Sequence, residues 1–579
     1  MFFKESQAKA CSYQIYALNI WNFGVLDWNR TSDLWLRRPT LYPTELQAQN
    51  SSTHFFKKSY NIFCDSQACS VIYLVELFHN NLKLREVNFY KVSNCMSKMK
   101  NMIGKIVPIY RNEITKFLCI AGLIVLITYV HSVLKISKDA LVISHLGTET
   151  ISAIKLYAGL PMSLLFMFLY IKLSDVFTRS HLFHAMNWFF IAYFVLFATV
   201  LYPNSEALSI HISESVIASM PSFKYLFKML AYWHYCLFYC FSESWVTIML
   251  SISFWQTANH IINIDQSKRF YPLIGIVAQI GLFFAGYLAA AFAVEGADWQ
   301  PALNSITMSI VAAGVGISGL LFAIEKSVGV QNFNSKHNLN GTPSKKPKAK
   351  LSFGESLKYI ASSKPILLIA SLLLCYNISI NLVEGIWKKS IEVMFSGNAN
   401  QVQHYLGSVN VYISIGSVIC AFAGIYIVRN CKWRTSALIT PIAILVTGGA
   451  FFLFMLLKDS AHLMAYAGSA LGVLGMGIFF GSANNVFARS TKHTLFDSTK
   501  EMVYIPLDDE LKTKGKAAAE TIGMRFGKGS GAFIQQVLLG LFPAATLMDL
   551  SPIISGIFLA LLVGWILATI NLSKLFDKA

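Results

Sequence analysis

Charged residues are scarce in this chain of 579 residues. Asp, Glu, Lys and Arg make up 13% of it, whereas a soluble domain carries about 25%. Apolar residues reach 55%, and the mean hydropathy is +0.51. This shortage of charge argues against a soluble enzyme and, over most of the length, against disorder. The composition instead predicts a polytopic membrane protein.

Paired cysteine motifs are also missing. The ten cysteines are scattered without two C-x-x-C units, so neither a zinc site nor a disulfide framework is indicated. Basic residues outnumber acidic ones by 48 to 30, but they are not gathered in one polar domain. We therefore expect no metal or other cofactor and no nucleic-acid partner. The net charge of +18 is interpreted as a signal of membrane topology.

Residues 1–95 have no apolar run long enough to span a membrane, and no signal-peptide core. The stretch from Leu41 to Leu46 can be encoded by DNA whose reverse complement is similar to a tRNA D-arm. The stretch from Trp28 to Thr31 similarly matches a T-arm. We predict that residues 1–95 are an antisense reading of a neighbouring tRNA gene, with the true start at Met96, Met99 or Met102. The alternative is a genuine, disordered extension.

From about residue 115 the chain is a series of apolar runs of about 20 residues, the length that crosses a bilayer as a helix. Twelve such runs predict an all-α membrane protein. The eleventh is the weakest, because Arg525 and Lys528 lie inside it. The expected helices are near 117–135, 153–173, 182–202, 228–256, 271–294, 303–324, 365–386, 406–428, 436–457, 463–487, 522–547 and 553–572.

One long basic stretch, residues 326–363, divides these helices six and six. We predict two six-helix halves, residues 96–325 and 364–579, joined by a cytoplasmic linker as in major-facilitator carriers. Lys and Arg favour the loops after even-numbered helices, which predicts that both termini are cytoplasmic. The loop after the seventh helix departs from this pattern, and a miscounted helix would invert half of the loops. Binding of the linker to anionic lipid is a secondary interpretation.

Charges at helix centres cost about 2.5–3.5 kcal/mol on insertion scales, so such residues are functional candidates. Glu243 lies in the fourth helix, Glu384 ends the seventh, and Arg525 and Lys528 share one face of the eleventh. Lys138 follows the first helix, either at the membrane interface or, if the helix continues, at the mouth of a cavity. Two acids and three bases suit a polyvalent anion with hydroxyl and amino groups better than an alkali cation.

Each candidate has a structural alternative. Glu243 could be a protonated or hydrogen-bonded core carboxyl, and Glu384 could form a surface pair with Lys388 four residues on. The two cations of the eleventh helix could extend to the membrane interface. Their glycine-rich surroundings do not make a P-loop, because Ile522 and Gly529 stand where that motif needs glycine and a hydroxyl residue.

Several motifs in one order carry a resemblance that runs from about Met99 to the C-terminus. They are LKISKD at 134–139, FWQTAN at 254–259, NLVEGIWK at 381–388, LFDSTKEMVYIPLD at 495–508, KGKAA at 514–518 and GKGSG at 527–531. In these segments the chain resembles the ATP/ADP translocases, the nucleotide transporters of obligate intracellular bacteria and plastids.

The resemblance implies a twelve-helix carrier that exchanges nucleotides across the bacterial inner membrane, most often ATP for ADP and phosphate. Family residues important for exchange fall on Lys138, Glu243, Glu384 and Lys528. The family's Glu-Leu-Trp-Gly is Glu-Ser-Trp-Val here, and its Gly-Lys-Ser-Gly-Gly is Gly-Lys-Gly-Ser-Gly. These departures leave GTP, CTP and UTP open as alternative substrates, and the exchange mode and oligomeric state also remain open.

We predict alternating access, with residues 115–325 rocking against 360–572 around a midplane site. Lys138, Arg525 and Lys528 would bind phosphates. Glu243 and Glu384 would hold ribose or base, or pair with the cations of an empty site. Asn259 could read a base edge, and an aromatic such as Trp245, Phe254 or Trp255 could stack on the base.

Rival functions are a proton-coupled carrier of sugars or peptides that uses Glu243, a membrane-embedded enzyme, and a receptor or scaffold. The histidines are dispersed and form neither H-x-x-x-D nor H-E-x-x-H units, which disfavours the enzyme. A receptor or scaffold would not need so many charges at membrane depth. A carrier is therefore the favoured interpretation.

Overall fold

Long helices, one after another, make up the structure, a computed structural model that describes residues 109–294, 296, 298–328, 363–508, 511, 515–520, 523 and 527–576. The described helices all belong to one unit, residues 110–579, and no strand occurs among them. The extension 1–95, nearly all of the linker 326–363, and Arg525 lie outside the described residues, as does the side chain of Lys528.

The first half has six membrane-length segments, several of them divided into consecutive helical pieces. In chain order the elements are η1 (Arg111–Glu113), α6 (Ile114–His145), α7 (Glu149–Ala153), η2 (Ile154–Gly159), α8 (Leu160–Val176), α9 (Arg179–Leu196), η3 (Phe197–Leu201), α10 (Ser205–Leu208), α11 (Glu214–Ser219), η4 (Pro221–Phe223), α12 (Lys224–Ala231), α13 (Trp233–Trp245), η5 (Val246–Phe254), α14 (Trp255–Ile261), α15 (Ile264–Ala291) and α16 (Gln300–Val328).

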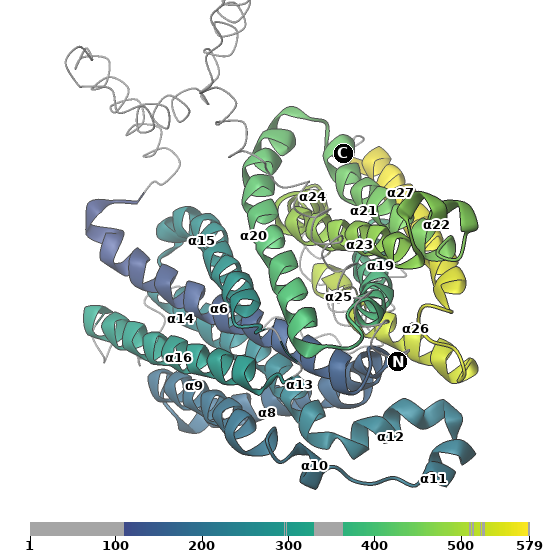
Figure 1. The fold of residues 1–579 in the computed structure, drawn as a ribbon. Coiled ribbons are helices and arrows are strands. Elements are labelled where there is room, and N and C mark those ends of the chain that lie inside the picture. Colours follow the sequence, from purple (N-terminus) through teal and green to yellow (C-terminus); the bar gives the residue numbers. More distant parts are fainter. Residues whose placement is uncertain are drawn as a thin grey trace, which may run out of the picture. The chain divides into compact units, whose positions relative to one another are not determined.

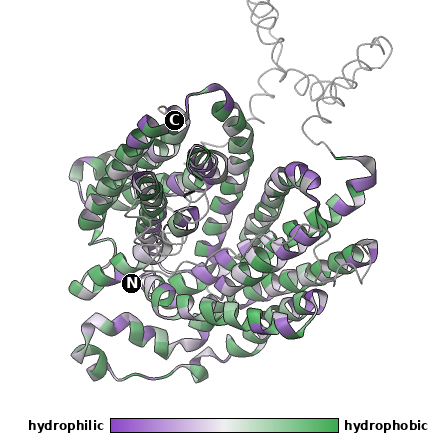
Figure 2. Cartoon of the chain, turned by 180° about the vertical axis from the view of Figure 1, so that it is seen from behind, coloured by the Kyte–Doolittle hydropathy of each residue, from purple (hydrophilic) through white to green (hydrophobic). Residues whose placement is uncertain are grey.

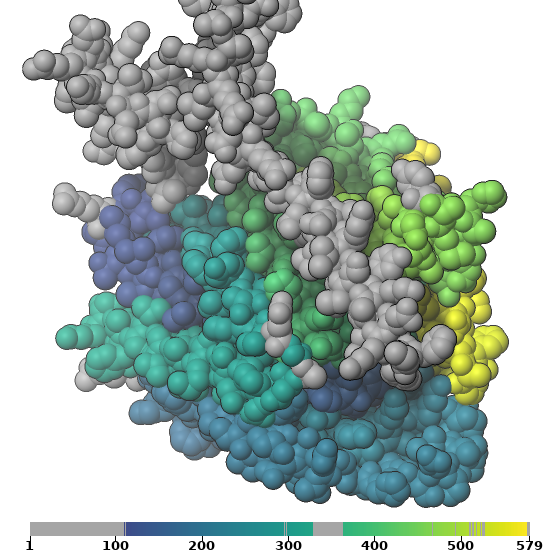
Figure 3. Space-filling view, viewed as in Figure 1, coloured from purple at the N-terminus to yellow at the C-terminus, as the bar shows by residue number. Residues whose placement is uncertain are grey.

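The second half begins after the linker. Its elements are α19 (Lys364–Met394), α20 (Ala399–Asn430), α21 (Trp433–Leu456), α22 (Ala461–Ala467), α23 (Ala470–Thr491), η6 (Lys492–Phe496), α24 (Asp497–Tyr504), α25 (Lys516–Glu520), α26 (Gly527–Leu541) and α27 (Ser551–Phe576). Figure 1 shows the helices of the two halves as two neighbouring groups, and Figure 3 shows them in space-filling form.

The predicted all-α membrane fold is confirmed. Eleven segments of the described chain are long and apolar enough to cross a bilayer, and the shorter apolar helix α26 occupies the place of the predicted eleventh helix. Apolar residues dominate these helices, as Figure 2 shows. Apolar length is a local property of the sequence, which is why the hydropathy pattern finds these segments.

The first helix is longer than the sequence indicated. We expected it to end near residue 135, but α6 continues through Lys138 to His145 and stops before Gly147, whose φ is +85°. Charged residues at 135, 138 and 139 do not end the helix, because the backbone remains bonded and the side chains find polar surroundings within the protein. Lys138 is therefore buried inside the bundle, with 4% of its side chain exposed.

Helices α15 and α20 form the main seam between the halves, and their backbones approach closely. A Cβ added at Gly286 would lie 2.6 Å from the carbonyl of Gly407, and one at Gly407 would lie 2.7 Å from the carbonyl of Gly286. Side chains of α20 also donate to α15: Asn410 to the Leu282 carbonyl at 2.8 Å, and Gln403 to the Ala289 carbonyl at 2.9 Å. Small residues at such crossings let helices pack at short range.

Most of the polar contacts between the halves, among the described residues, lie toward one end of the helices. They join the C-terminal parts of α6, α15, α19 and α26 to the N-terminal parts of α7 and α20 and to the connection that follows α15. Helix η4 and the first residue of α12 add two more, since Ser222 donates to the Gly540 carbonyl at 2.9 Å and Lys224 donates to the Pro543 carbonyl. We call this the closed end, at which α6 finishes at His145 and α19 at Met394.

Candidate substrate site

Helix α6 places three charged side chains in the bundle interior, at Lys135, Lys138 and Asp139. The spacing i, i+3, i+4 puts them on one side of the helix. Lys138 Nζ lies 2.7 Å from Glu243 Oε1, 3.5 Å from Asp139 Oδ1 and 3.6 Å from the centre of the Tyr239 ring. The Glu243 side chain is 41% exposed although it lies in the middle of a membrane-length segment. A carboxylate so placed faces a polar space rather than lipid.

Helix α19 brings the opposing charges from the second half. Lys388 Nζ lies 2.8 Å from Asp139 Oδ2 of α6 and 3.0 Å from Glu384 Oε1 of its own helix. The other carboxylate oxygen of Glu384 lies 3.3 Å from the guanidinium of Arg489, on α23. The side chains of Asp139 and Lys388 are each only 4% exposed. This ion pair joins the two halves directly at a buried position.

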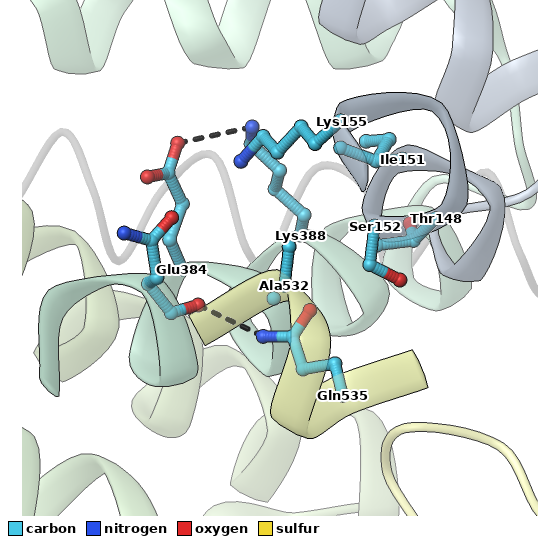
Figure 4. A pocket seen from close by; sticks show the side chains of 10 residues that line it. Thr148, Ile151, Ser152, Lys155, Glu384, Lys388, Ala532 and Gln535 are labelled. Atoms are coloured by element: carbon cyan, nitrogen blue, oxygen red, sulfur yellow. Dashed lines mark hydrogen bonds and ion pairs between the residues drawn. The ribbon is translucent and has the colours of Figure 1, made fainter. Parts of the chain in front are cut away.

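Two further lysines lie at the same cluster without a direct partner. Lys155 is on the π-helical segment η2 and Lys135 is on α6, and both are partly buried. Each interacts electrostatically with Glu384, yet neither forms a hydrogen bond or an ion pair with any described residue. Figure 4 shows Lys155 and Lys388 converging from different helices on one side of the Glu384 carboxylate.

Two pockets meet at this group. The first is lined by Lys155, Glu384 and Lys388 with polar residues of α7, α19 and α26. The second is lined by Lys135, Asp139 and Arg489, and it also reaches Glu384 and Lys388. Both pockets therefore share the Glu384–Lys388 pair, and each contains one lysine that has no ion-pair or hydrogen-bond partner in the part of the chain that the structure describes.

The cluster carries more positive than negative charge. Its cations are Lys135, Lys138, Lys155, Lys388 and Arg489, and its acids are Asp139, Glu243 and Glu384. Counted as formal charges at their usual protonation, five minus three leaves an excess of two positive charges among these described residues. Uncompensated charge at membrane depth is costly unless a ligand of opposite sign supplies the balance. The arrangement can bind an anion that carries several charges.

A second ionic layer covers the cluster toward the closed end. Lys389 Nζ lies 3.2 Å from Glu149 Oε1 and 2.7 Å from Glu392 Oε1, and Glu392 accepts from the Thr148 backbone at 2.7 Å. Gln536 of α26 donates to Ser152 Oγ at 2.6 Å. These contacts tie α7 of the first half to α19 and α26 of the second, between the charge cluster and the ends of the helices.

Three of the predicted site residues are brought together. Lys138 and Glu243 pair directly, and Asp139 and Lys388 connect them to Glu384. The predicted contact of Glu384 with Lys388 is present, but it is buried rather than at the surface. In the structure, acids of this group are thus paired with cations.

Asn259 does not join this group. It is exposed on α14 and accepts a hydrogen bond from the Tyr271 hydroxyl at 2.5 Å. Sixteen residues separate it from Glu243 on one helical segment, which corresponds to about 24 Å at about 1.5 Å per residue. Trp245 and Phe254 are fully buried among neighbouring helices in this conformation, so neither ring is open to a base.

Sequence reasoning missed Asp139, Lys388, Lys135, Lys155 and Arg489. Counting loop charges placed Lys388 in a connection, and the expected end of the first helix near residue 135 left Asp139 beyond that helix. Helical spacing could have found three of them, since 135, 138 and 139 share one face, as do 384 and 388. Lys155 and Arg489 are in neither set, so this spacing does not indicate them.

Three glycines around the eleventh predicted helix serve helix packing. A Cβ added at Gly523, Gly527 or Gly531 would come within 2.8 Å of the Cβ of Leu373, Asn377 or Asn381, respectively, all on α19. The series therefore lets α19 lie against this segment.

Membrane-length helices in two groups, with a buried charge cluster where the groups meet, define a membrane transporter. Comparison with known proteins makes this specific. The family model described as TLC ATP/ADP transporter matches residues 92–576. The chain belongs to this TLC ATP/ADP transporter family.

Curated relatives match over nearly their whole length. ADP,ATP carrier protein 3 of Rickettsia bellii is 38% identical over 83% of this chain and 98% of the relative. ADP,ATP carrier protein 1 of the same species is 36% identical over 84% and 97%. Among solved structures, a bacterial homologue of the iron transporter ferroportin in an inward-facing state aligns with a TM-score of 0.52. That alignment has 13% identity and covers 80% of this chain and 100% of the other. This last likeness concerns the fold alone.

Proposed function

We propose that this protein exchanges nucleotides across the bacterial inner membrane, most often ATP for ADP, by alternating access. The observation that carries the proposal is the excess of buried cations where the two halves meet, because a polyphosphate supplies the missing negative charge. The family and the relatives named ADP,ATP carriers support the same substrate class.

The proposed movement is a rocking of the half before the linker against the half after it. Lys138 and Lys528 would bind phosphates, together with Arg525, while Glu243 and Glu384 would take hydroxyl or amino groups of the nucleotide. Glu243 lies 2.7 Å from Lys138, so an entering phosphate would displace Glu243 from this lysine. The freed carboxylate would then be available to ribose or base.

Both termini would be cytoplasmic, which agrees with the positive charge of the loops after even-numbered helices. With this orientation α6 and α19 finish on the outer side of the membrane. The closed end would then be the outer end, and the ionic layer of Lys389, Glu149 and Glu392 would shut the site from outside. Substrate would reach the site from the cytoplasm in this conformation.

Uptake of radiolabelled nucleotides by cells that express the chain tests the function. ATP, GTP, CTP and UTP would be compared with and without ADP inside the cells. We expect uptake of ATP that internal ADP stimulates. Uptake of another nucleotide in preference to ATP would reassign the base, whereas absence of uptake for all four would contradict the proposal.

Variants connect the activity to the cluster. Lys138→Gln and Lys528→Gln should each reduce uptake while the protein still inserts into the membrane. Lys172→Gln is the matched control, because Lys172 lies exposed at the end of α8. Normal uptake by the first two variants would contradict the assignment of those residues. Uptake that follows a pH gradient without internal nucleotide would favour the rival proton-coupled carrier.

A further inference from the structure

Lys135 and Lys155 differ from the other cations of the cluster in what neutralises them. Lys138 contacts Glu243 and Asp139, Lys388 contacts Asp139 and Glu384, and Arg489 contacts Glu384. Lys135 and Lys155 contact no carboxylate, carbonyl or hydroxyl among the described residues. The excess of two positive charges is accounted for by these two side chains.

Cations without a partner bind an anion at the lowest cost. A phosphate that contacts Lys138 has to replace Glu243, so part of its interaction energy is spent on separating an existing pair. A phosphate that contacts Lys135 or Lys155 displaces no protein group. Hydrogen bonds to charged groups are also stronger than hydrogen bonds between neutral groups. These two lysines are therefore better placed for phosphate in the present conformation than Lys138.

The two lysines lie in different pockets that meet at one pair. Lys155 lines the pocket beside Thr148 and Gln535, and Lys135 lines the pocket beside Arg489 and Asn485. Glu384 and Lys388 line both. A chain of two or three phosphates has a phosphate group for a cation in each pocket, whereas a monophosphate has only one phosphate group to place.

We propose that Lys135 and Lys155 bind separate phosphates of the nucleotide and so set its preference for di- and triphosphates over monophosphates. The inference rests on the proposed nucleotide transport and adds to it the side chains that measure the length of the phosphate chain. Lys155 stands on a π-helical segment, an irregularity that is frequent at functional sites. This π-helical segment sits directly beside the pocket that Lys155 lines.

Competition of labelled ATP uptake by the unlabelled adenine mono-, di- and triphosphate tests this, with the full chain and with Lys135→Gln, Lys155→Gln and the double variant. The wild type should bind more tightly as phosphates are added. Each single variant should weaken apparent ATP binding by about tenfold or more, since a bond to a charged group is lost. The same variants should change the value for the monophosphate much less, and the double variant should nearly abolish the dependence on chain length.

Controls separate binding from folding. Lys135→Arg and Lys155→Arg keep the charge and should retain most of the affinity, and Lys172→Gln should behave as the wild type. Calorimetric binding of ATP and adenosine to the purified full chain adds a readout that does not require transport. In this measurement, the Gln variants should bind ATP more weakly than the wild type does. Their affinity for adenosine should equal that of the wild type.

Two results would overturn the inference. An equal loss of affinity for the mono-, di- and triphosphate would show that the lysines shape the cavity and do not bind separate phosphates. Unchanged ATP affinity in both single variants would show that they do not contact phosphate. In either case uptake by the wild type leaves the proposed function standing, whereas a wild type that takes up no nucleotide removes both.

Discussion

The ion pair between Asp139 and Lys388 leads to a prediction about why transport should be an exchange. The pair crosses from α6 to α19 at 2.8 Å, and both side chains are 4% exposed. If the closed end opens, these two helices separate. The Asp139 carboxylate and the Lys388 ammonium then lose their ion pair. We predict that this cost prevents an empty carrier from switching, and that a bound nucleotide offsets it with its own charges.

The change Asp139→Asn tests the prediction. Removing one partner of a buried pair costs about 3–5 kcal/mol. Lys388 keeps Glu384 at 3.0 Å, so the lower end of that range applies. About 3 kcal/mol corresponds to roughly 100-fold in an equilibrium at about 1.4 kcal/mol per factor of ten. In the Asp139→Asn variant, the closed conformation without substrate is therefore less stable by this free energy. The variant should then switch between conformations without substrate correspondingly more often.

Efflux from preloaded cells measures the effect. Wild-type efflux of labelled ADP should depend on external nucleotide, and Asp139→Asn should release ADP into nucleotide-free medium up to about 100-fold faster. Lys388→Gln should act similarly, and the double variant should add less than the sum of the two, because both changes remove one interaction. Strict dependence on external nucleotide in Asp139→Asn, or effects that add fully, would refute the reasoning.

Three further predictions concern the rest of the fold. Gly407→Val should reduce transport at least tenfold at equal protein level, because its side chain would collide with α15 at the seam and overpacking costs about 1–3 kcal/mol; Gly564→Val, with open space around it, is the control, and equal activity of the two would contradict this. Asn259→Ala should leave apparent ATP affinity within about twofold in the uptake assay, at the low end of what a lost hydrogen bond changes, because the residue is exposed and far from the cluster; a larger loss would return Asn259 to the site. The pKa of Glu113 is lowered to about 2, chiefly by its hydrogen bonds from Arg269, so its stabilising effect is complete above its ordinary pKa of 4.5 and disappears as the pH falls through about 2. Thermal unfolding of wild type and Glu113→Gln should therefore differ at pH 7 and converge toward pH 2, and a constant difference would argue against this pair.

The charged residues show how far local pattern goes. Glu243 and Glu384 could be selected from the sequence, because an acid inside an apolar run is visible without any knowledge of its neighbours. Lys388 was assigned to a loop, because charge counting takes the end of the apolar run for the end of the helix. In the structure α19 continues to Met394, so Lys388 lies inside it and points at Asp139.

The sequence by itself determined the class of fold and its membrane helices, because apolar length and periodicity are properties of short segments. It also determined that charges lie at membrane depth. Only the tertiary structure decided which charges meet, since residues 249 positions apart, as Asp139 and Lys388 are, come together through the rotation and crossing of helices. The same geometry places Asn259 away from the charge cluster and leaves Lys135 and Lys155 without an ion-pair or hydrogen-bond partner among the described residues. Hydropathy could not give this, because it records how deep a residue lies but not which way its side chain points.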